Sequence, residues 1–155
     1  MKYRHAAVSA ILVLLLSFTV QTQATAETCE AAVHGLNSRL SSRIDEQELV
    51  GVLRSLNSSD NKKLPSTFVT KKEARSRGWK PGKNLWSVKT LRGSSIGGDR
   101  FSNREGQLPD GAWREADLDY QGGHRGGKRL IFSREGRRFV TVDHYRTFTE
   151  VPSCR

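Results

Sequence analysis

The candidate proton-transfer residues of this chain are its histidines. His144 occupies an Asp-His-Tyr sequence at residues 143–145, at the end of an expected strand, and His124 lies in the glycine-rich segment 122–127. His34 falls in the first expected helix, where a solvent-facing or packing role is the simpler interpretation. A strand-end histidine beside an acid and an aromatic residue is compatible with acid–base catalysis, and a structural role is the alternative.

Arg125 and Arg129 bracket a glycine-rich turn. Because the backbone between Arg125 and Arg129 is flexible, their guanidinium groups can converge on one phosphate; the alternative is a solvated basic loop. The sequence has no HExxH motif, no calcium-binding loop motif and no phosphate-binding GxxxxGK loop. We therefore expect a site that uses neither a metal ion nor a cofactor.

The chain is strongly basic. It carries 26 Lys and Arg against 16 Asp and Glu, a formal net charge of +10, and loss of the amino-terminal Lys2 and Arg4 leaves +8. Such an excess attracts polyanions, of which nucleic acid and an anionic membrane are the obvious candidates. The alternative is that the charge only keeps the protein soluble.

Residues 1–26 have the features of an export signal. A basic start precedes the apolar residues 6–20, and Ala24-Thr25-Ala26 fits a small-x-small cleavage site. The apolar run is shorter than the roughly 20 residues that a membrane-spanning helix needs. We expect cleavage after Ala26, secretion to the periplasm or the medium, and no membrane attachment of the mature residues 27–155.

Cys29 and Cys154 are the only cysteines. Because an export signal implies an oxidising compartment, we expect this pair to form a disulfide between the two ends of the mature chain. Neither cysteine belongs to a CxxC motif or has a histidine cluster beside it, so neither a catalytic nor a metal-binding role is expected. Residues 27–155 suffice for one domain with one core.

Helical periodicity occupies the first part of the mature chain and alternation the second. We expect helices over Glu30–Arg43, Asp45–Leu56 and Lys71–Arg77, the last between an N-cap at Thr70 and a stop at Gly78. From about residue 94 the pattern has period two. The strands it predicts are Trp113–Tyr120, Lys128–Ser133, Arg137–Val142 and, at the sheet edge, Phe148–Val151.

This order of elements predicts an α+β domain, with N-terminal helices packed on one face of a C-terminal antiparallel sheet. If Ala116 faces the helices, Glu115 points to the opposite face. In the next strand Leu130 faces the helices, so Arg129 shares that opposite face with Glu115. We expect this carboxylate and this guanidinium to lie on an exposed sheet surface.

Short sequence blocks between residues 64 and 149 match those of a known protein family in their order and in their spacing. They include Gly78-Trp79, Ser95-Ile96-Gly97-Gly98-Asp99, Phe101-Ser102-Asn103-Arg104-Glu105-Gly106, Trp113-Arg114-Glu115-Ala116-Asp117 and Asp143-His144-Tyr145. Together they resemble the barnase family of guanyl-preferring bacterial ribonucleases, which belongs to the microbial ribonucleases. Residues 27–60 are then a helical N-terminal extension of a single ribonuclease domain.

The resemblance implies the microbial ribonuclease fold and metal-independent cleavage of single-stranded RNA after guanosine, through a 2′,3′-cyclic phosphate. It makes Glu115 the general base and His144 the general acid, with Asp99 and Asp117 as structural supports. The phosphate-binding residues it implies are Lys71, Arg125 and Arg129. The guanine-binding residues it implies are Phe101, Ser102, Asn103, Arg104, Glu105 and Tyr145. We expect a monomer, with a small acidic inhibitor of the barstar kind as a possible partner.

Some features depart from the family pattern. The segment between Pro109 and Trp113 is shorter, and His124 and Lys128 replace Phe and Asp, which predicts a more basic phosphate loop. The helical extension is longer, and the cysteine pair is foreign to barnase. Two other functions are alternatives for a basic chain: a cationic RNA-binding module without catalysis, and a membrane-active defence protein, whose basic amphipathic helix is not matched by the acidic start of the second helix.

Overall fold

The computed structural model describes residues 27–155, so the expected export signal lies outside the described residues. Apart from a two-residue strand before the third helix, the helices come first and the strands after them, as the sequence pattern predicts. The elements are α1 (Cys29–Asn37), α2 (Glu46–Ser58), β1 (Phe68–Val69), α3 (Lys71–Ser76), two short 3-10 helices η1 (Leu85–Ser87) and η2 (Lys89–Leu91), β2 (Ser95–Arg100), β3 (Trp113–Asp117), β4 (Arg129–Ser133), β5 (Arg138–Thr141) and β6 (Thr149–Glu150).

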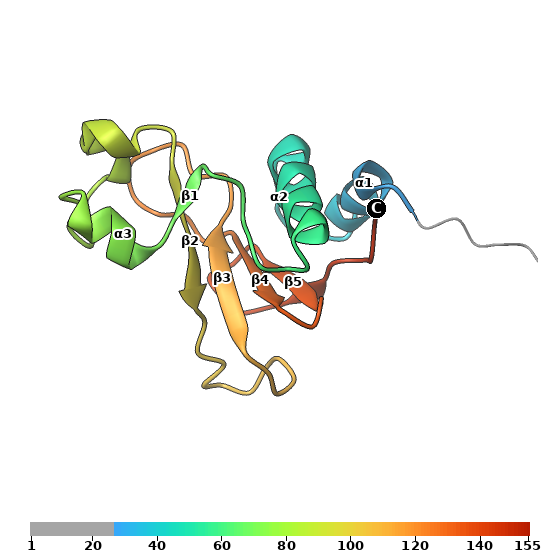
Figure 1. The fold of residues 1–155 in the computed structure, drawn as a ribbon. Coiled ribbons are helices and arrows are strands. Elements are labelled where there is room, and N and C mark those ends of the chain that lie inside the picture. Colours follow the sequence, from blue (N-terminus) through green and yellow to red (C-terminus); the bar gives the residue numbers. More distant parts are fainter. Residues whose placement is uncertain (1–26) are drawn as a thin grey trace, which may run out of the picture.

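Helices α1 and α2 pack on one face of a six-stranded sheet (Figure 1). Leucines recur along α2 at helical spacing and are fully buried there, because they meet the inward-facing residues of β3, β4 and β5. This main core confirms the predicted α+β architecture and its facing. Its largest members are Val33, Leu36, Leu49, Leu53, Leu56, Leu130 and Phe132.

The strands lie in the order β1-β2-β3-β4-β5-β6, and each pair from β2 onward is antiparallel. The predicted C-terminal antiparallel sheet is confirmed, and at one edge a strand that was not predicted, β1, pairs with β2 in parallel. Phe68 lies opposite Ser95, and Val69 lies opposite Ile96. A strand of two residues is too short to show alternation, so the sequence pattern could not predict it.

Helix α1 ends at Asn37, six residues before the predicted end at Arg43. The side chain of Asn37 is buried, donates to the carbonyl oxygen of Ile44 at 2.8 Å and accepts from its amide at 2.9 Å. These two hydrogen bonds close the turn between the helices. Helix α2 then starts after Asp45, whose carboxylate caps the amide of Glu48 at 2.8 Å.

Helix α3 has the predicted start but packs elsewhere than α1 and α2. Thr70 and Glu73 form a reciprocal capping box, and Gly78 leaves the helix with a φ of +97°. The helix lies beside β1, away from α1 and α2 (Figure 1). With η1 and η2 it encloses a second core of Val69, Ala74, Trp79, Leu85, Leu91, Ile96 and Tyr120.

Strand β3 ends at Asp117, three residues before the predicted end at Tyr120. Asp119 has a φ of +56°, which no strand accommodates. The turn carries Tyr120 into the second core, where its hydroxyl accepts from the amide of Leu85 at 2.9 Å. The chain thus leaves the sheet immediately after the Asp117 carboxylate.

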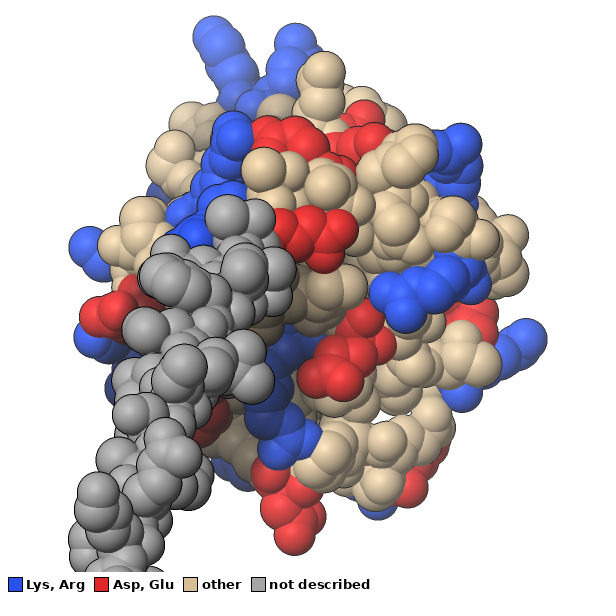
Figure 2. Space-filling view, turned by 90° about the vertical axis from the view of Figure 1, so that its right-hand side faces the viewer, with Lys and Arg blue, Asp and Glu red and all other residues tan. Residues whose placement is uncertain are grey.

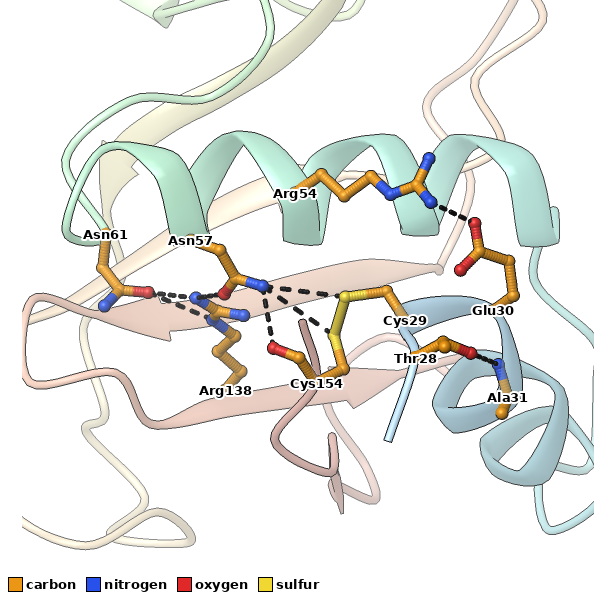
Figure 3. Close-up of a disulfide and its surroundings, with 9 residues drawn as sticks. All are labelled: Thr28, Cys29, Glu30, Ala31, Arg54, Asn57, Asn61, Arg138 and Cys154. Atoms are coloured by element: carbon orange, nitrogen blue, oxygen red, sulfur yellow. Dashed lines mark hydrogen bonds and ion pairs between the residues drawn. A yellow bond between two sulfur atoms is a disulfide. The ribbon is translucent and has the colours of Figure 1, made fainter. Parts of the chain in front are cut away.

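A disulfide joins Cys29, at the start of α1, to Cys154. The Asn57 amide donates to the Cys154 carbonyl at 2.9 Å, and Asn57 Oδ1 accepts from Arg138 at 2.8 Å (Figure 3). Arg138 also donates to Asn61. The expected pairing is therefore present, and hydrogen bonds connect it to α2 and β5.

Removing this disulfide should destabilise the fold without altering the active-site residues. For a loop closed over 125 residues, the chain-entropy account predicts a loss of about 5 kcal/mol in the free energy of unfolding for the double variant Cys29→Ser, Cys154→Ser. Urea denaturation of the oxidised protein and the variant measures it. An unchanged unfolding midpoint would contradict a stabilising role.

Candidate active site

Glu115 lies on β3, on the sheet face opposite α1 and α2. Its Oε1 lies 2.7 Å from Nζ of Lys71, at the start of α3, and its Oε2 accepts from the Tyr145 hydroxyl at 2.7 Å. The Glu115 side chain is only 8% exposed. The expectation of an exposed sheet surface is wrong here, because α3 and the segment around residue 145 supply side chains that cover this face.

The neighbours of Glu115 keep it ionised. Burial raises the pKa of the Glu115 carboxyl, but the hydrogen bonds from Lys71 and Tyr145 and the charges of Lys71 and Arg125 outweigh burial and hold that pKa below its usual value. Burial and the hydrogen bond to this carboxylate raise the pKa of Tyr145 to about 12. At neutral pH the pair is a carboxylate accepting from a neutral phenol.

Asp117, two residues after Glu115 on β3, binds both arginines of the candidate phosphate site. Arg125 contacts its carboxylate through Nε at 2.5 Å and Nη2 at 2.7 Å. Nε of Arg129 lies 2.9 Å from Oδ1, within ion-pair distance but without the alignment of a hydrogen bond. The carboxylate is 2% exposed, so both guanidiniums are oriented by one buried charge.

Lys71, Arg125 and Arg129 thus come together around the carboxylates of β3. Lys71 is positioned at the first turn of α3 because its amide donates to Asp99 Oδ2 at 2.8 Å. The Arg129 guanidinium lies over the Tyr145 ring, 5.9 Å from its centroid. The side chains of Lys71 and Arg125 remain 30% and 26% exposed, which leaves them accessible to an anion.

His144 lies in a tight turn after β5. Its φ is +56° and that of Tyr145 is +66°, so two successive residues are in the left-handed region. The His144 amide donates to the Gly127 carbonyl at 3.2 Å. Its imidazole packs so closely on Gly127 that a Cβ there would lie 2.5 Å from Nδ1. His144 is therefore placed against the loop that carries Arg125, and it is exposed.

Asp143 organises this turn. Its carboxylate accepts from the amides of Arg146 and Thr147 at 3.0 Å each, and from the hydroxyls of Thr141 and Thr147 at 2.9 and 2.7 Å. Burial raises the pKa of Asp143, but these hydrogen bonds outweigh it and lower the pKa to about 2. The ionised carboxylate thus holds the backbone after His144 and the side chain of Thr141 before it.

A pocket of about 190 Å³ opens beside Tyr145. The rings of Phe101 and Tyr145 are stacked with centroids 5.4 Å apart, and Phe148 meets Phe101 edge-on. All six residues of the predicted guanine site line this pocket, so the structure brings them together. The full lining is Phe101, Ser102, Asn103, Arg104, Glu105, Gln107, Tyr145 and Phe148.

Residues 27–155 contain no group of three or more His, Cys, Asp or Glu side chains that could hold a metal ion. In the same residues no helix has the length and apolar character needed to cross a bilayer.

Comparisons with known proteins match this region of the chain. A family model described as ribonuclease matches residues 54–152. The ribonucleases of Bacillus intermedius and Bacillus pumilus are each 47% identical over 94 residues, which are 58% of this chain and 57% of each relative. That of Heyndrickxia coagulans is 46% identical over 94 residues, 58% of this chain and 84% of the relative. The chain belongs to the ribonuclease family.

The match to this ribonuclease family contains every predicted catalytic, phosphate-binding and guanine-binding residue. It begins at residue 54, so α1 and the first two turns of α2 lie outside it. The matched part spans less than two thirds of the length of the two Bacillus relatives.

Two residues that line the pocket were not predicted from the sequence. Gln107 donates to Glu105 Oε2 at 2.9 Å, and Phe148 adds a third ring. The sequence pattern predicts Phe148 only as a residue of the edge strand. Asn103 was predicted for the guanine site, but both polar atoms of its side chain bind the backbone of Leu108.

Lys128, one of the two residues behind the prediction of a more basic phosphate loop, is paired with an acidic residue. Its Nζ lies 2.6 Å from Asp119 Oδ2 and also donates to the Arg43 carbonyl. This ion pair neutralises the added charge and directs it towards the helices. His124 is exposed in the loop, as expected from the glycines around it.

The hydrogen bonds of Asp143 make the folding stability depend on pH in the acid range. Because folding lowers the pKa of Asp143 from its usual 3.8 to about 2, its contribution is complete above about pH 4 and is lost as the pH falls through the folded pKa. We expect Asp143→Asn to be less stable than the parent at neutral pH, with a difference that shrinks towards pH 2. Urea denaturation across this range measures it, with the exposed Asp110→Asn as control; a pH-independent difference would contradict the assignment.

Proposed function

We propose that the protein is a secreted, metal-independent endoribonuclease that cleaves single-stranded RNA on the 3′ side of guanosine. The observation that carries the proposal is a buried, ionised Glu115 in contact with Lys71 and with Tyr145, whose ring also lines the pocket of the predicted guanine site. Membership in the ribonuclease family and the names of the Bacillus relatives support RNA as the substrate.

The proposed reaction begins at the ribose. Glu115 takes the proton of the 2′-hydroxyl, and the 2′-oxygen attacks the adjacent phosphorus in line with the departing 5′-oxygen. His144 gives that oxygen a proton, so the products are a 2′,3′-cyclic phosphate and a free 5′-hydroxyl. The reaction requires RNA because DNA lacks the attacking hydroxyl. The low pKa of Glu115 keeps the base ionised at neutral pH.

The cations have a separate role in this proposal. Lys71, Arg125 and Arg129 hold the scissile phosphate and stabilise the negative charge that develops on it. Because Asp117 already orients the two guanidiniums, little rearrangement is needed when the phosphate arrives. Burial of Asp117 also prevents water from screening these contacts.

Base recognition is assigned to the pocket lined by the 101–105 segment. The Glu105 carboxylate would accept from the N–H edge of guanine, and backbone amides of the loop would donate to its O6. Phe101 and Tyr145 flank the base. Asn103 stabilises this loop through Leu108, and Gln107 holds the Glu105 carboxylate from one side.

Net charge supports a polyanionic substrate, with a small acidic inhibitor as a possible protein partner. On the face seen in Figure 2, at the α1 side of the molecule, Lys and Arg are interspersed with Asp and Glu. That face shows no unbroken basic surface. The three cations around Glu115 instead come together at the site itself. A disulfide between Cys29 and Cys154 suits an oxidising, extracytoplasmic location.

Two substitutions test the acid–base pair. We expect Glu115→Gln and His144→Asn each to lower the cleavage rate by about 100-fold or more, since each removes one proton-transfer group. Asn tolerates the left-handed backbone at position 144. The measurement is digestion of a defined single-stranded RNA in EDTA, with mapping of the cut positions and terminal phosphates.

Matched controls are Glu135→Gln and His34→Asn, which change the same residue types at exposed positions. Both should cleave like the parent. Near-normal cleavage by either test variant would reject that residue's role, and a requirement for added metal would reject a metal-independent site. Leakage of anionic vesicles by a protein that leaves RNA intact would favour the membrane-active alternative.

Guanine preference depends on Glu105 in this proposal. Glu105→Gln replaces an acceptor by a group that also presents N–H donors, and hydrogen bonds to charged groups contribute about 1.5–3 kcal/mol. We expect the ratio of kcat/KM for GpA over ApA to fall by about 10-fold. Steady-state kinetics on the two dinucleotides measure it, with the exposed Glu150→Gln as control; an unchanged ratio would remove Glu105 from base recognition.

A further inference from the structure

Two residues of the β3–β4 loop, residues 118–128, form an ion pair that is attached to the helical layer by hydrogen bonds. Lys128 Nζ contacts Asp119 Oδ2 at 2.6 Å and donates to the carbonyl of Arg43, in the turn before α2. The side chains of Lys128 and Asp119 are 25% and 21% exposed. Because both are largely withdrawn from solvent, the pair is less weakened by screening than a surface salt bridge.

Asp119 also makes two hydrogen bonds to the start of α2. Its Oδ1 accepts from the amide of Asp45 at 2.9 Å, and its own amide donates to Glu48 Oε2 at 2.7 Å. These contacts hold a non-glycine residue at a φ of +56°, a conformation that surrounding contacts must maintain. The loop therefore starts from a fixed point on the amino-terminal end of α2.

At the other end of the loop, the backbone of Lys128 contacts an arginine of the candidate phosphate site. The carbonyl of Lys128 accepts from the Leu118 amide at 3.1 Å and from Arg129 Nη1 at 2.7 Å. Arg129 in turn lies against Asp117, which binds Arg125. Displacement of Lys128 would thus release one of the contacts that orient the Arg129 guanidinium.

The residues that receive these contacts, Arg43, Asp45 and Glu48, lie outside the family match at 54–152. We propose that the Asp119–Lys128 pair and the segment Arg43–Glu48 form a positioning element for the phosphate-binding arginines. Lys128 acts through Arg129 and does not itself touch the substrate. This inference rests on the proposed function only for the role of Arg125 and Arg129.

The test separates positioning from direct phosphate binding by Lys128. If the pair positions the loop, Lys128→Met and Asp119→Asn each lower kcat by about 10-fold or more, since small misplacements of catalytic groups are costly. The double variant should be no worse than the poorer single variant. Lys128→Arg, which keeps the charge, should recover most of the rate. Lys80→Met, at an exposed site, controls for the loss of one positive charge.

Direct phosphate binding predicts a different pattern and would overturn the proposal. Asp119→Asn would then free Lys128 and leave activity unchanged or raised, while Lys128→Met would raise KM and reduce the salt dependence of binding. Unfolding midpoints of all variants ensure that rates are compared on folded protein.

Hydrogen exchange gives a measurement that does not depend on RNA cleavage. We expect the amides of Leu118 and His144, which bind the carbonyls of Lys128 and Gly127, to exchange faster in both single variants than in Lys80→Met. Unchanged exchange would overturn the positioning role. If the parent protein fails to cleave RNA while exchange accelerates, the proposed function fails and the positioning element stands.

Discussion

Burial of two carboxylates on one strand is the constraint on which the site depends. Alternation on β3 places Glu115 and Asp117 on the same sheet face, and both side chains are almost withdrawn from solvent. An unpaired buried charge is strongly unfavourable, so each carboxylate requires cations from other elements. Lys71 comes from α3, Arg125 from the β3–β4 loop and Arg129 from the start of β4. The charge balance of one strand thereby fixes where three separate segments meet.

Much of this arrangement could be predicted from the sequence, because period-two alternation is a local property. Ala116 facing the helices and Glu115 facing away follow from β3 alone. What alternation could not show is what covers the second face. Burial of Glu115 depends on Lys71 and Tyr145, which lie 44 and 30 residues away in the chain. Contacts between residues so far apart in the chain leave no periodic signal in the sequence, so alternation alone predicts an exposed Glu115.

The predicted ends of the elements are wrong where a side chain competes with the backbone for hydrogen bonds. Asn37 ends α1 because its amide group binds Ile44 on both sides, and the amphipathic pattern continues past that point. Lys128 shows the same limitation for charge. Its position in the loop predicts added positive charge near the phosphate site, whereas its partner Asp119 is close only because the chain turns with a positive φ after β3. Turn geometry of this kind is set by contacts with α2.

Tyr145 is shared between the two halves of the site: its ring is a wall of the pocket, and its hydroxyl binds Glu115. In an enzyme of the proposed kind, a nucleobase that fits poorly and shifts this ring also removes a hydrogen bond from the base that starts the reaction. A poorly fitting nucleotide would then lower the turnover of the RNA more than its binding affinity. An RNA could occupy the cleft with the wrong base and still remain uncut.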